Sequence, residues 1–160
     1  MKGFFNRILK IDLEAKSFKA EIIPDSVFET YLGGKGLGLY LLLKENPPGV
    51  DPFSPQNRLI FCLGPATDSR IHGSCRHGVF TKSPLTGIFS ESYSGGKLAE
   101  PMSRTGYDAF ILEETSEEPV WIEISDQKVI FHDAKDLWGK DTVTSHINPA
   151  EYHSIKWISD

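Results

Sequence analysis

The sequence predicts an α+β fold that is rich in short, mainly antiparallel strands. Apolar and polar residues alternate over many short segments, which are separated by glycine, proline and polar turns. Helical patterns are few and short, and strands and helices do not alternate as they do in a doubly wound sheet. The 160 residues, of which 39% are hydrophobic and 24% charged, are enough for one domain with its own core.

The chain begins with a predicted β-hairpin. Residues 8–13 and 18–22 each alternate between apolar and polar positions on either side of a polar turn, and Pro24 ends the second strand. Ser26 and Glu29 follow in the spacing of a capping box, in which a hydroxyl and a carboxylate bind free amides at a helix start. We therefore expect a short helix that begins near Ser26.

A second helix is predicted from about residue 36 to residue 45. The Asn-Pro-Pro-Gly sequence at 46–49 ends it. Residues 46–57 contain four prolines, so they are expected to cross the surface as a stiff segment. The apolar run at 58–63 then predicts a buried strand.

The second half of the chain is predicted to consist mainly of strands. They are expected at 75–81, 88–93 and 107–113, with a further hairpin formed by 119–124 and 128–131. Residues 96–104 are helix-like in pattern, although Pro101 is expected to break or kink a helix there.

Composition excludes several classes of protein. The net charge of −5 and the pI of about 5.5 disfavour a nucleic-acid-binding protein. The longest apolar run, 37–43, is far shorter than a membrane span, and the N-terminus lacks a signal-peptide pattern. We expect a protein of the cytoplasm with no nucleic-acid or membrane partner.

The two cysteines, Cys62 and Cys75, limit the metal chemistry of this chain. A [4Fe–4S] cluster and a closed zinc site each need about four ligands, so two cysteines build neither. Their small number in a chain without a leader indicates a reducing compartment. Cys75 precedes Arg76 and His77, which favours a lowered thiol pKa, but the sequence identifies no second catalytic partner for a thiol nucleophile.

The middle of the chain is the best candidate for a binding region. Most of the glycines lie between residues 33 and 96, together with nine serine and threonine hydroxyls from Thr67 to Ser94. Basic residues accompany them: Arg70, Arg76, Lys82 and Lys97. This composition suits a phosphorylated ligand with many hydrogen-bonding groups, although turns alone also require many glycines. The cluster at 33–38 matches neither the dinucleotide nor the P-loop spacing.

Several segments in order carry a resemblance to one family. They are Tyr31–Tyr40, Asp51–Pro55, Thr81–Gly87, Ser94–Gly96 followed by Gly106–Ala109, and Leu137–Lys140. Over roughly residues 1–147 the chain resembles the N-terminal domain of the aldehyde ferredoxin oxidoreductase family. That resemblance implies a β-rich base with two related sheet-containing halves and a few short helices.

The resemblance also implies a function. Members of the family oxidise aldehydes to carboxylic acids with a tungsten- or molybdenum-bis-pterin cofactor, whose phosphates are bridged by Mg²⁺. They pass electrons through a [4Fe–4S] cluster to ferredoxin. In the family the cluster ligands lie beyond this region, so this chain is expected to need the remaining domains or a partner subunit, to be inactive alone and to supply no catalytic residue. A homodimer is also expected.

Three cofactor contacts follow from the resemblance: Arg76, Tyr93 and Gly95. Arg76 matches the basic contact to the pterin, and the loop that begins at Tyr93 brings backbone close to the cofactor. Tyr93 stands where the family commonly has asparagine. A backbone-carbonyl contact to Mg²⁺ tolerates this change, whereas a side-chain contact would be lost or altered.

Residues 148–160 do not resemble the family's helical continuation. A truncated or frame-shifted gene and a separate subunit both account for this atypical tail. The main hypothesis is a cofactor-base domain of an aldehyde oxidoreductase. The alternatives are a non-catalytic pterin- or phosphate-binding or assembly subunit and an inert fragment of a larger enzyme.

Overall fold

The computed structural model describes residues 1–141 and 155–159, which contain nine strands and three helices. The strands are β1 (Arg7–Asp12), β2 (Ser17–Ile22), β3 (Leu59–Leu63), β4 (His77–Lys82), β5 (Phe89–Ser94), β6 (Ala109–Glu113), β7 (Val120–Ile124), β8 (Val129–Asp133) and β9 (Ile155–Ser159). The helices are α1 (Asp25–Tyr31), α2 (Lys35–Glu45) and α3 (Ala99–Arg104).

The strands form two sheets. The larger sheet has six strands in the order β2-β1-β6-β3-β4-β5, and the smaller has three in the order β8-β7-β9. Among the described strands β1 and β6 pair in parallel, whereas all the other pairs are antiparallel. The predicted α+β class with mainly antiparallel strands and two sheets is therefore confirmed.

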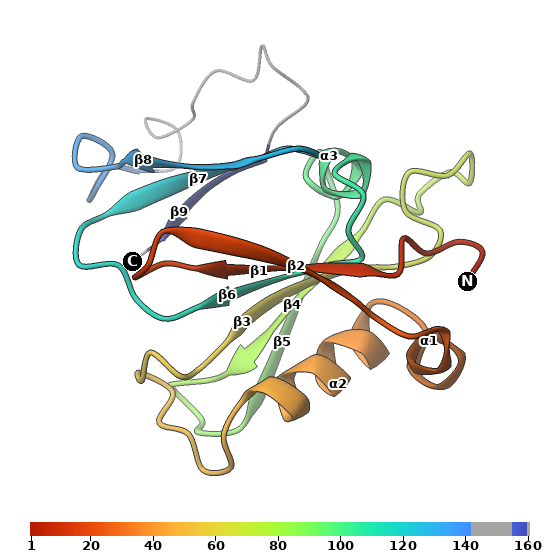
Figure 1. The fold of residues 1–160 in the computed structure, drawn as a ribbon, viewed down its shortest axis with the longest axis horizontal. Helices are drawn as coiled ribbons and strands as arrows, with labels where there is room; N and C mark the ends of the chain where they lie inside the picture. The colour runs from red at the N-terminus through yellow and green to blue at the C-terminus, as the bar shows by residue number, and fades with distance from the viewer. Residues whose placement is uncertain (142–154, 160) are drawn as a thin grey trace.

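The six-stranded sheet is covered on both faces, as Figure 1 shows. Helices α1 and α2 lie against one face, while α3 and the smaller sheet lie on the other. Each face has its own cluster of buried side chains. One contains Phe28, Leu37 and Leu41 of the two helices, and the other contains Met102 of α3 and Ile122 of β7.

The central strands alternate between the two cores. In β3, Ile60 and Cys62 contribute to the cluster under α2, whereas Phe61 and Leu63 contribute to the cluster under α3. This period of two follows from the pleat of a strand, and residues apolar at every position are what a doubly covered strand needs. The continuous apolar run seen in the sequence has this cause.

The predicted capping box at the start of α1 is wrong. The helix begins at Asp25 after Pro24, whose backbone is extended, and its N-terminus has no side-chain capping hydrogen bond. Ser26 is therefore already inside the first turn, where its hydroxyl has no free amide ahead of it to cap. The helix itself was predicted correctly.

The expected break at Pro101 is also absent. Pro101 is the third residue of α3, which begins at Ala99 and not at residue 96. The first helical amides have no acceptor within the helix, so a residue without an N–H costs little there. The Met102 amide makes the next hydrogen bond, to the Leu98 carbonyl at 3.1 Å.

Part of the predicted tail at 148–160 falls outside the described residues, namely 148–154 and 160. The described part is β9, which pairs antiparallel with β7. Val120 pairs with Ser159 at one end of this ladder, and Ile124 pairs with Ile155 at the other. The boundary at residue 147 stays a prediction.

Candidate functional site

The structure brings the three predicted contact residues together at one end of the β4–β5 ladder. His77 pairs with Ser94 and Gly78 pairs with Tyr93. Arg76 immediately precedes this ladder and Gly95 immediately follows it, so the two residues are neighbours at its open end. The antiparallel hairpin thus places residues almost twenty positions apart in one site.

The Arg76 side chain is available for an anion. Arg76 is exposed, and its guanidinium forms no ion pair with any residue that the structure describes. Its backbone, in contrast, is held: the amide donates to the Ser74 carbonyl at 2.9 Å, and the carbonyl accepts from the Thr67 hydroxyl at 3.3 Å. A fixed backbone with a free planar guanidinium suits bidentate binding of phosphate.

The glycines that follow β5 leave the backbone open. A Cβ placed on Gly95 would meet only the Cys75 carbonyl oxygen, at 3.8 Å, so nothing in the described chain crowds this position. Gly96 has a φ of +81°, which favours glycine, and likewise has open space around it. A ligand can therefore approach the main chain closely here.

Tyr93 is held on both its ring and its hydroxyl. Its ring borders the space left by Gly78, where an added Cβ would lie 2.5 Å from the Phe80 ring and 3.1 Å from the Tyr93 ring, and the two rings meet edge-on with centroids 6.0 Å apart. Its hydroxyl donates to Glu91 Oε2 at 3.1 Å, and Glu91 Oε1 accepts from Lys35 Nζ at 2.8 Å. Partial burial and the Glu91 carboxylate raise the pKa of the Tyr93 phenol.

The glycine cluster before α2 serves packing. The Gly34 amide donates to the Leu63 carbonyl at 2.7 Å, and a Cβ on Gly33 would lie 2.8 Å from the same oxygen. A Cβ on Gly36 would lie only 1.9 Å from the Tyr31 carbonyl oxygen. These close approaches explain the glycines without a nucleotide, in agreement with the mismatch to nucleotide motifs.

The structure does not support a thiol nucleophile at Cys75. His77 is buried, burial lowers the pKa of its imidazole, and its Nδ1 has no hydrogen-bond partner among the described residues. Cys62 is fully buried, and this burial raises the pKa of its thiol. Within residues 1–141 and 155–159, no three His, Cys, Asp or Glu side chains are grouped as a metal site.

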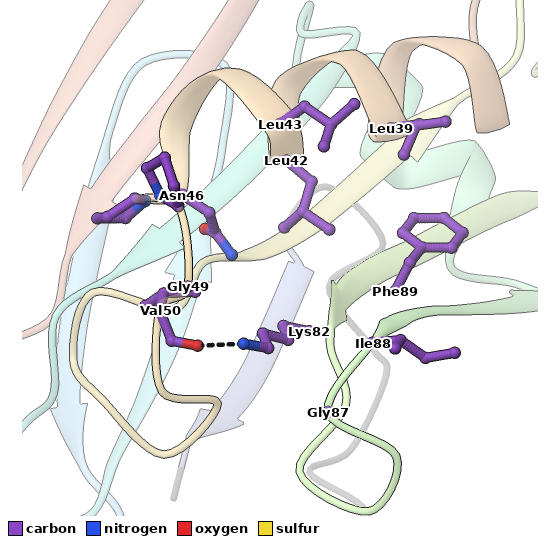
Figure 2. Close-up of a pocket in the computed structure, with 12 residues that line it drawn as sticks. Leu39, Leu42, Leu43, Asn46, Gly49, Val50, Lys82, Gly87, Ile88 and Phe89 are labelled. Carbon is purple, nitrogen blue, oxygen red and sulfur yellow. Dashed lines mark hydrogen bonds between the residues drawn. The ribbon is translucent and has the colours of Figure 1, made fainter.

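An apolar cavity of about 380 Å³ lies at the other end of the same hairpin. Figure 2 shows its walls between α2 and the β4–β5 turn, with Lys82 donating a hydrogen bond to the Val50 carbonyl. Its apolar lining includes Leu39, Leu42, Leu43, Val50, Ile88 and Phe89. Sequence reasoning missed this cavity, although the apolar Ile88 beside a turn was a signal.

The Thr81–Gly87 segment builds this turn. Ser83 donates its amide to the Ile88 carbonyl and accepts from the Gly87 amide, each at 2.8 Å, and Gly87 has a φ of +69°. The Thr81–Gly87 segment, the most specific match to the family in the sequence, therefore forms the hairpin turn at the opposite end of the ladder from Arg76.

The profile of a family described as "Aldehyde ferredoxin oxidoreductase, N-terminal domain" matches residues 8–156. A tungsten-containing aldehyde ferredoxin oxidoreductase of Pyrococcus horikoshii is 41% identical over 140 residues, which are 88% of this chain and 23% of that protein. A protein of Pyrococcus furiosus with the same name is 40% identical over 140 residues, with the same coverage. The chain thus spans about a quarter of the length of these curated relatives.

A solved structure has the same fold. It is described as the active site complex BamBC of benzoyl coenzyme A reductase with 1,5-dienoyl-CoA. The match has a TM-score of 0.86 and 34% sequence identity, and it covers 90% of this chain and 22% of that one. In the described part of the present chain, no helix has the length and apolar character of a membrane span.

Proposed function

This chain belongs to the aldehyde ferredoxin oxidoreductase family, as its N-terminal domain, and on that premise we propose that it forms the base on which a metal–pterin cofactor lies. The cofactor would be a tungsten- or molybdenum-bis-pterin. The complete enzyme would oxidise aldehydes to carboxylic acids and pass the electrons to ferredoxin.

The observation that carries this proposal is the open end of the β4–β5 ladder. A guanidinium without an ion-pair partner in the described chain stands beside an uncrowded glycine backbone. Arg76 would bind a phosphate or a pterin acceptor atom, and the main chain at Gly95 would lie against the cofactor. These donor groups fit a phosphorylated ligand, because charged planar donors and exposed amides both bind phosphate oxygens.

Mg²⁺ fits the same place through Tyr93. Tyr93 lies in β5, an edge strand, where alternate carbonyls do not bond to a neighbouring strand. Mg²⁺ typically takes few protein ligands when phosphate oxygens are present. The Tyr93 carbonyl would therefore be one oxygen ligand of a cation held mainly by cofactor phosphates, and the tyrosine side chain in place of asparagine would not prevent this.

The bound metal–pterin group supplies the redox chemistry. The residues of this chain would bind and orient it. They would not ligate the [4Fe–4S] cluster, since Cys62 is buried in the core and leaves only Cys75. The cluster, the rest of the substrate site and the contact with ferredoxin would come from the remaining domains or a partner subunit, and the assembly would be a homodimer.

Binding of a 6-hydroxymethylpterin phosphate to the 160-residue chain tests the proposal. We expect Arg76→Ala to weaken binding about tenfold, because it removes a charge-assisted phosphate contact. Arg70→Ala is the matched control, since Arg70 is exposed in the loop before β4 and is not among the proposed contacts. An unchanged affinity of Arg76→Ala would remove the proposed site.

A second measurement concerns catalysis. With an aldehyde as substrate, the chain alone should not reduce a viologen dye. The chain expressed together with the rest of the enzyme, in medium containing tungstate or molybdate, should reduce the dye and should contain the metal. Substantial viologen reduction by the chain alone would overturn its role as a base.

A further inference from the structure

A chain of polar contacts joins the start of α2 to the candidate site. Lys35 is the first residue of α2, and its ammonium lies 2.8 Å from the Glu91 carboxylate of β5. The second oxygen of that carboxylate accepts the Tyr93 hydroxyl at 3.1 Å. These contacts join the start of α2, within the segment Tyr31–Tyr40 that resembles the family, to β5, which leads into the Ser94–Gly96 segment.

Tyr93 lies close to the Arg76–Gly95 end of the hairpin. Gly78 is the cross-strand partner of Tyr93, and one more pair, His77 and Ser94, completes the ladder. Arg76 directly precedes β4, and Gly95 directly follows β5. Tyr93 is therefore one ladder position from the end at which Arg76 would bind an anion.

The contact with Glu91 determines what the Tyr93 hydroxyl can do. A tyrosine hydroxyl has one hydrogen and two lone pairs, and an ionised carboxylate only accepts. The single hydrogen is therefore directed to Glu91 Oε2, while the Lys35 ammonium, 2.8 Å from Oε1 of the same carboxylate, favours its charged form. With 47% of Tyr93 exposed, its oxygen remains accessible as an acceptor.

We infer that the Lys35–Glu91 pair is a positioning device that presents Tyr93 to the ligand as a hydrogen-bond acceptor only. An acceptor selects an N–H edge, such as the amino group of a pterin ring, and it repels phosphate oxygens. Arg76 would then take the phosphate while Tyr93 takes the ring. This inference rests on the proposed function and adds which part of the cofactor each residue recognises.

The first test is spectroscopic. Tyrosine labelled with ¹³C at Cζ reports the hydrogen bonding of each phenol by NMR at neutral pH, and Tyr93→Phe identifies the Tyr93 signal. In Glu91→Ala this signal should shift, because the hydroxyl loses its acceptor, whereas in the control Glu117→Ala it should keep its position. An unchanged Tyr93 signal in Glu91→Ala would show that Glu91 does not hold the hydroxyl.

The second test separates ring from phosphate with two probes: 6-hydroxymethylpterin, which has no phosphate, and inorganic pyrophosphate. Tyr93→Phe should weaken hydroxymethylpterin binding about fivefold and leave pyrophosphate binding unchanged. Glu91→Ala frees the hydroxyl to donate, so it should strengthen pyrophosphate binding about fivefold. Glu117→Ala, which removes an exposed carboxylate elsewhere, is the control for net charge.

The double variant Glu91→Ala/Tyr93→Phe distinguishes the hydroxyl from the charge. If the gain in pyrophosphate affinity disappears in the double variant, the hydroxyl carries it, as inferred; if the gain persists, the charge alone carries it and the inference is wrong. If Arg76→Ala weakens pyrophosphate binding but Tyr93→Phe leaves hydroxymethylpterin binding unchanged, this inference is wrong and the proposed function stands. Binding of neither probe would overturn the proposed function as well.

Discussion

The Phe80 ring lies directly against Gly38, so that α2 approaches the six-stranded sheet more closely than a side chain at residue 38 allows. A Cβ added at Gly38 would come within 2.2 Å of the ring, and Phe80 itself is fully buried. The contact sets the spacing between helix and sheet. It therefore also sets where Lys35, at the start of the same helix, meets Glu91.

Gly38→Ala should destabilise the fold. Overpacking of a core costs up to about 3 kcal/mol, and a Cβ 2.2 Å from a fully buried ring belongs at the upper end of that range. Replacing glycine by alanine in a helix returns about 1 kcal/mol, so we expect a net loss of about 2 kcal/mol in urea unfolding. Lys44→Ala, on the exposed part of α2, is the control. Phe80→Leu should recover part of the loss in the double variant, and strict additivity of the two changes would contradict the contact.

The free energy of unfolding should decrease as the pH is lowered below 6.5, because of His77. Burial lowers the pKa of its imidazole below 6.5 in the folded state, whereas the unfolded chain takes up the proton near 6.5. The favourable contribution is therefore complete above pH 6.5 and is lost as the pH falls towards the lowered value, by at most about 1.4 kcal/mol per pH unit.

Urea unfolding of wild type and His77→Leu between pH 7.5 and 5 measures this effect. The difference in unfolding free energy between the two proteins should change below pH 6.5, since the variant lacks the group. His72→Gln, at an exposed histidine, should keep the wild-type profile. Parallel profiles for wild type and His77→Leu would show that His77 does not titrate as described.

Asp108 anchors the chain at the start of β1. Its carboxylate accepts the Phe5 amide at 3.1 Å and the Arg7 amide at 3.2 Å, on either side of Asn6, which has a φ of +58°. Asp108→Ala would leave two amides without an acceptor, so we expect a loss of about 2 kcal/mol in unfolding free energy. Asp108→Asn keeps one acceptor oxygen and should lose less. Equal losses in the two variants would argue for a packing role.

The two thiols should differ strongly in reactivity. Cys62 is fully buried with a raised pKa, whereas Cys75 is half-buried in the loop before β4. A thiol reagent at pH 8 should modify Cys75 in the folded protein and Cys62 only on unfolding. Cys75→Ser should therefore show no modification before unfolding, and rapid labelling of that variant would place Cys62 at the surface.

Local patterns predicted most strands and helices because each depends on residues close in the chain. The alternation in 8–13 is the pattern of a strand with one face covered, and the apolar run in 58–63 is the pattern of a strand with both faces covered. Sheet order was not predictable, because nothing local to β6 indicates that it lies between β1 and β3. The Lys35–Glu91 contact joins residues 56 positions apart, so no spacing rule identifies it. The resemblance supplied Arg76, Tyr93 and Gly95, and the register of β4 with β5 places them at one end of the ladder, while their role stays a prediction.

The place of β6 in the sheet has a consequence for how the protein folds. Strands β1 and β3 have no contact in the ladder until β6 lies between them, and the β1–β6 pairing joins Ile8 to Ala109. A parallel pairing over about a hundred residues is slow to form, because the loop must close before its contacts compensate for the lost entropy. The β4–β5 hairpin closes locally and early. During synthesis, the hairpin that carries the proposed cofactor contacts would therefore take shape before the rest of the sheet that supports it.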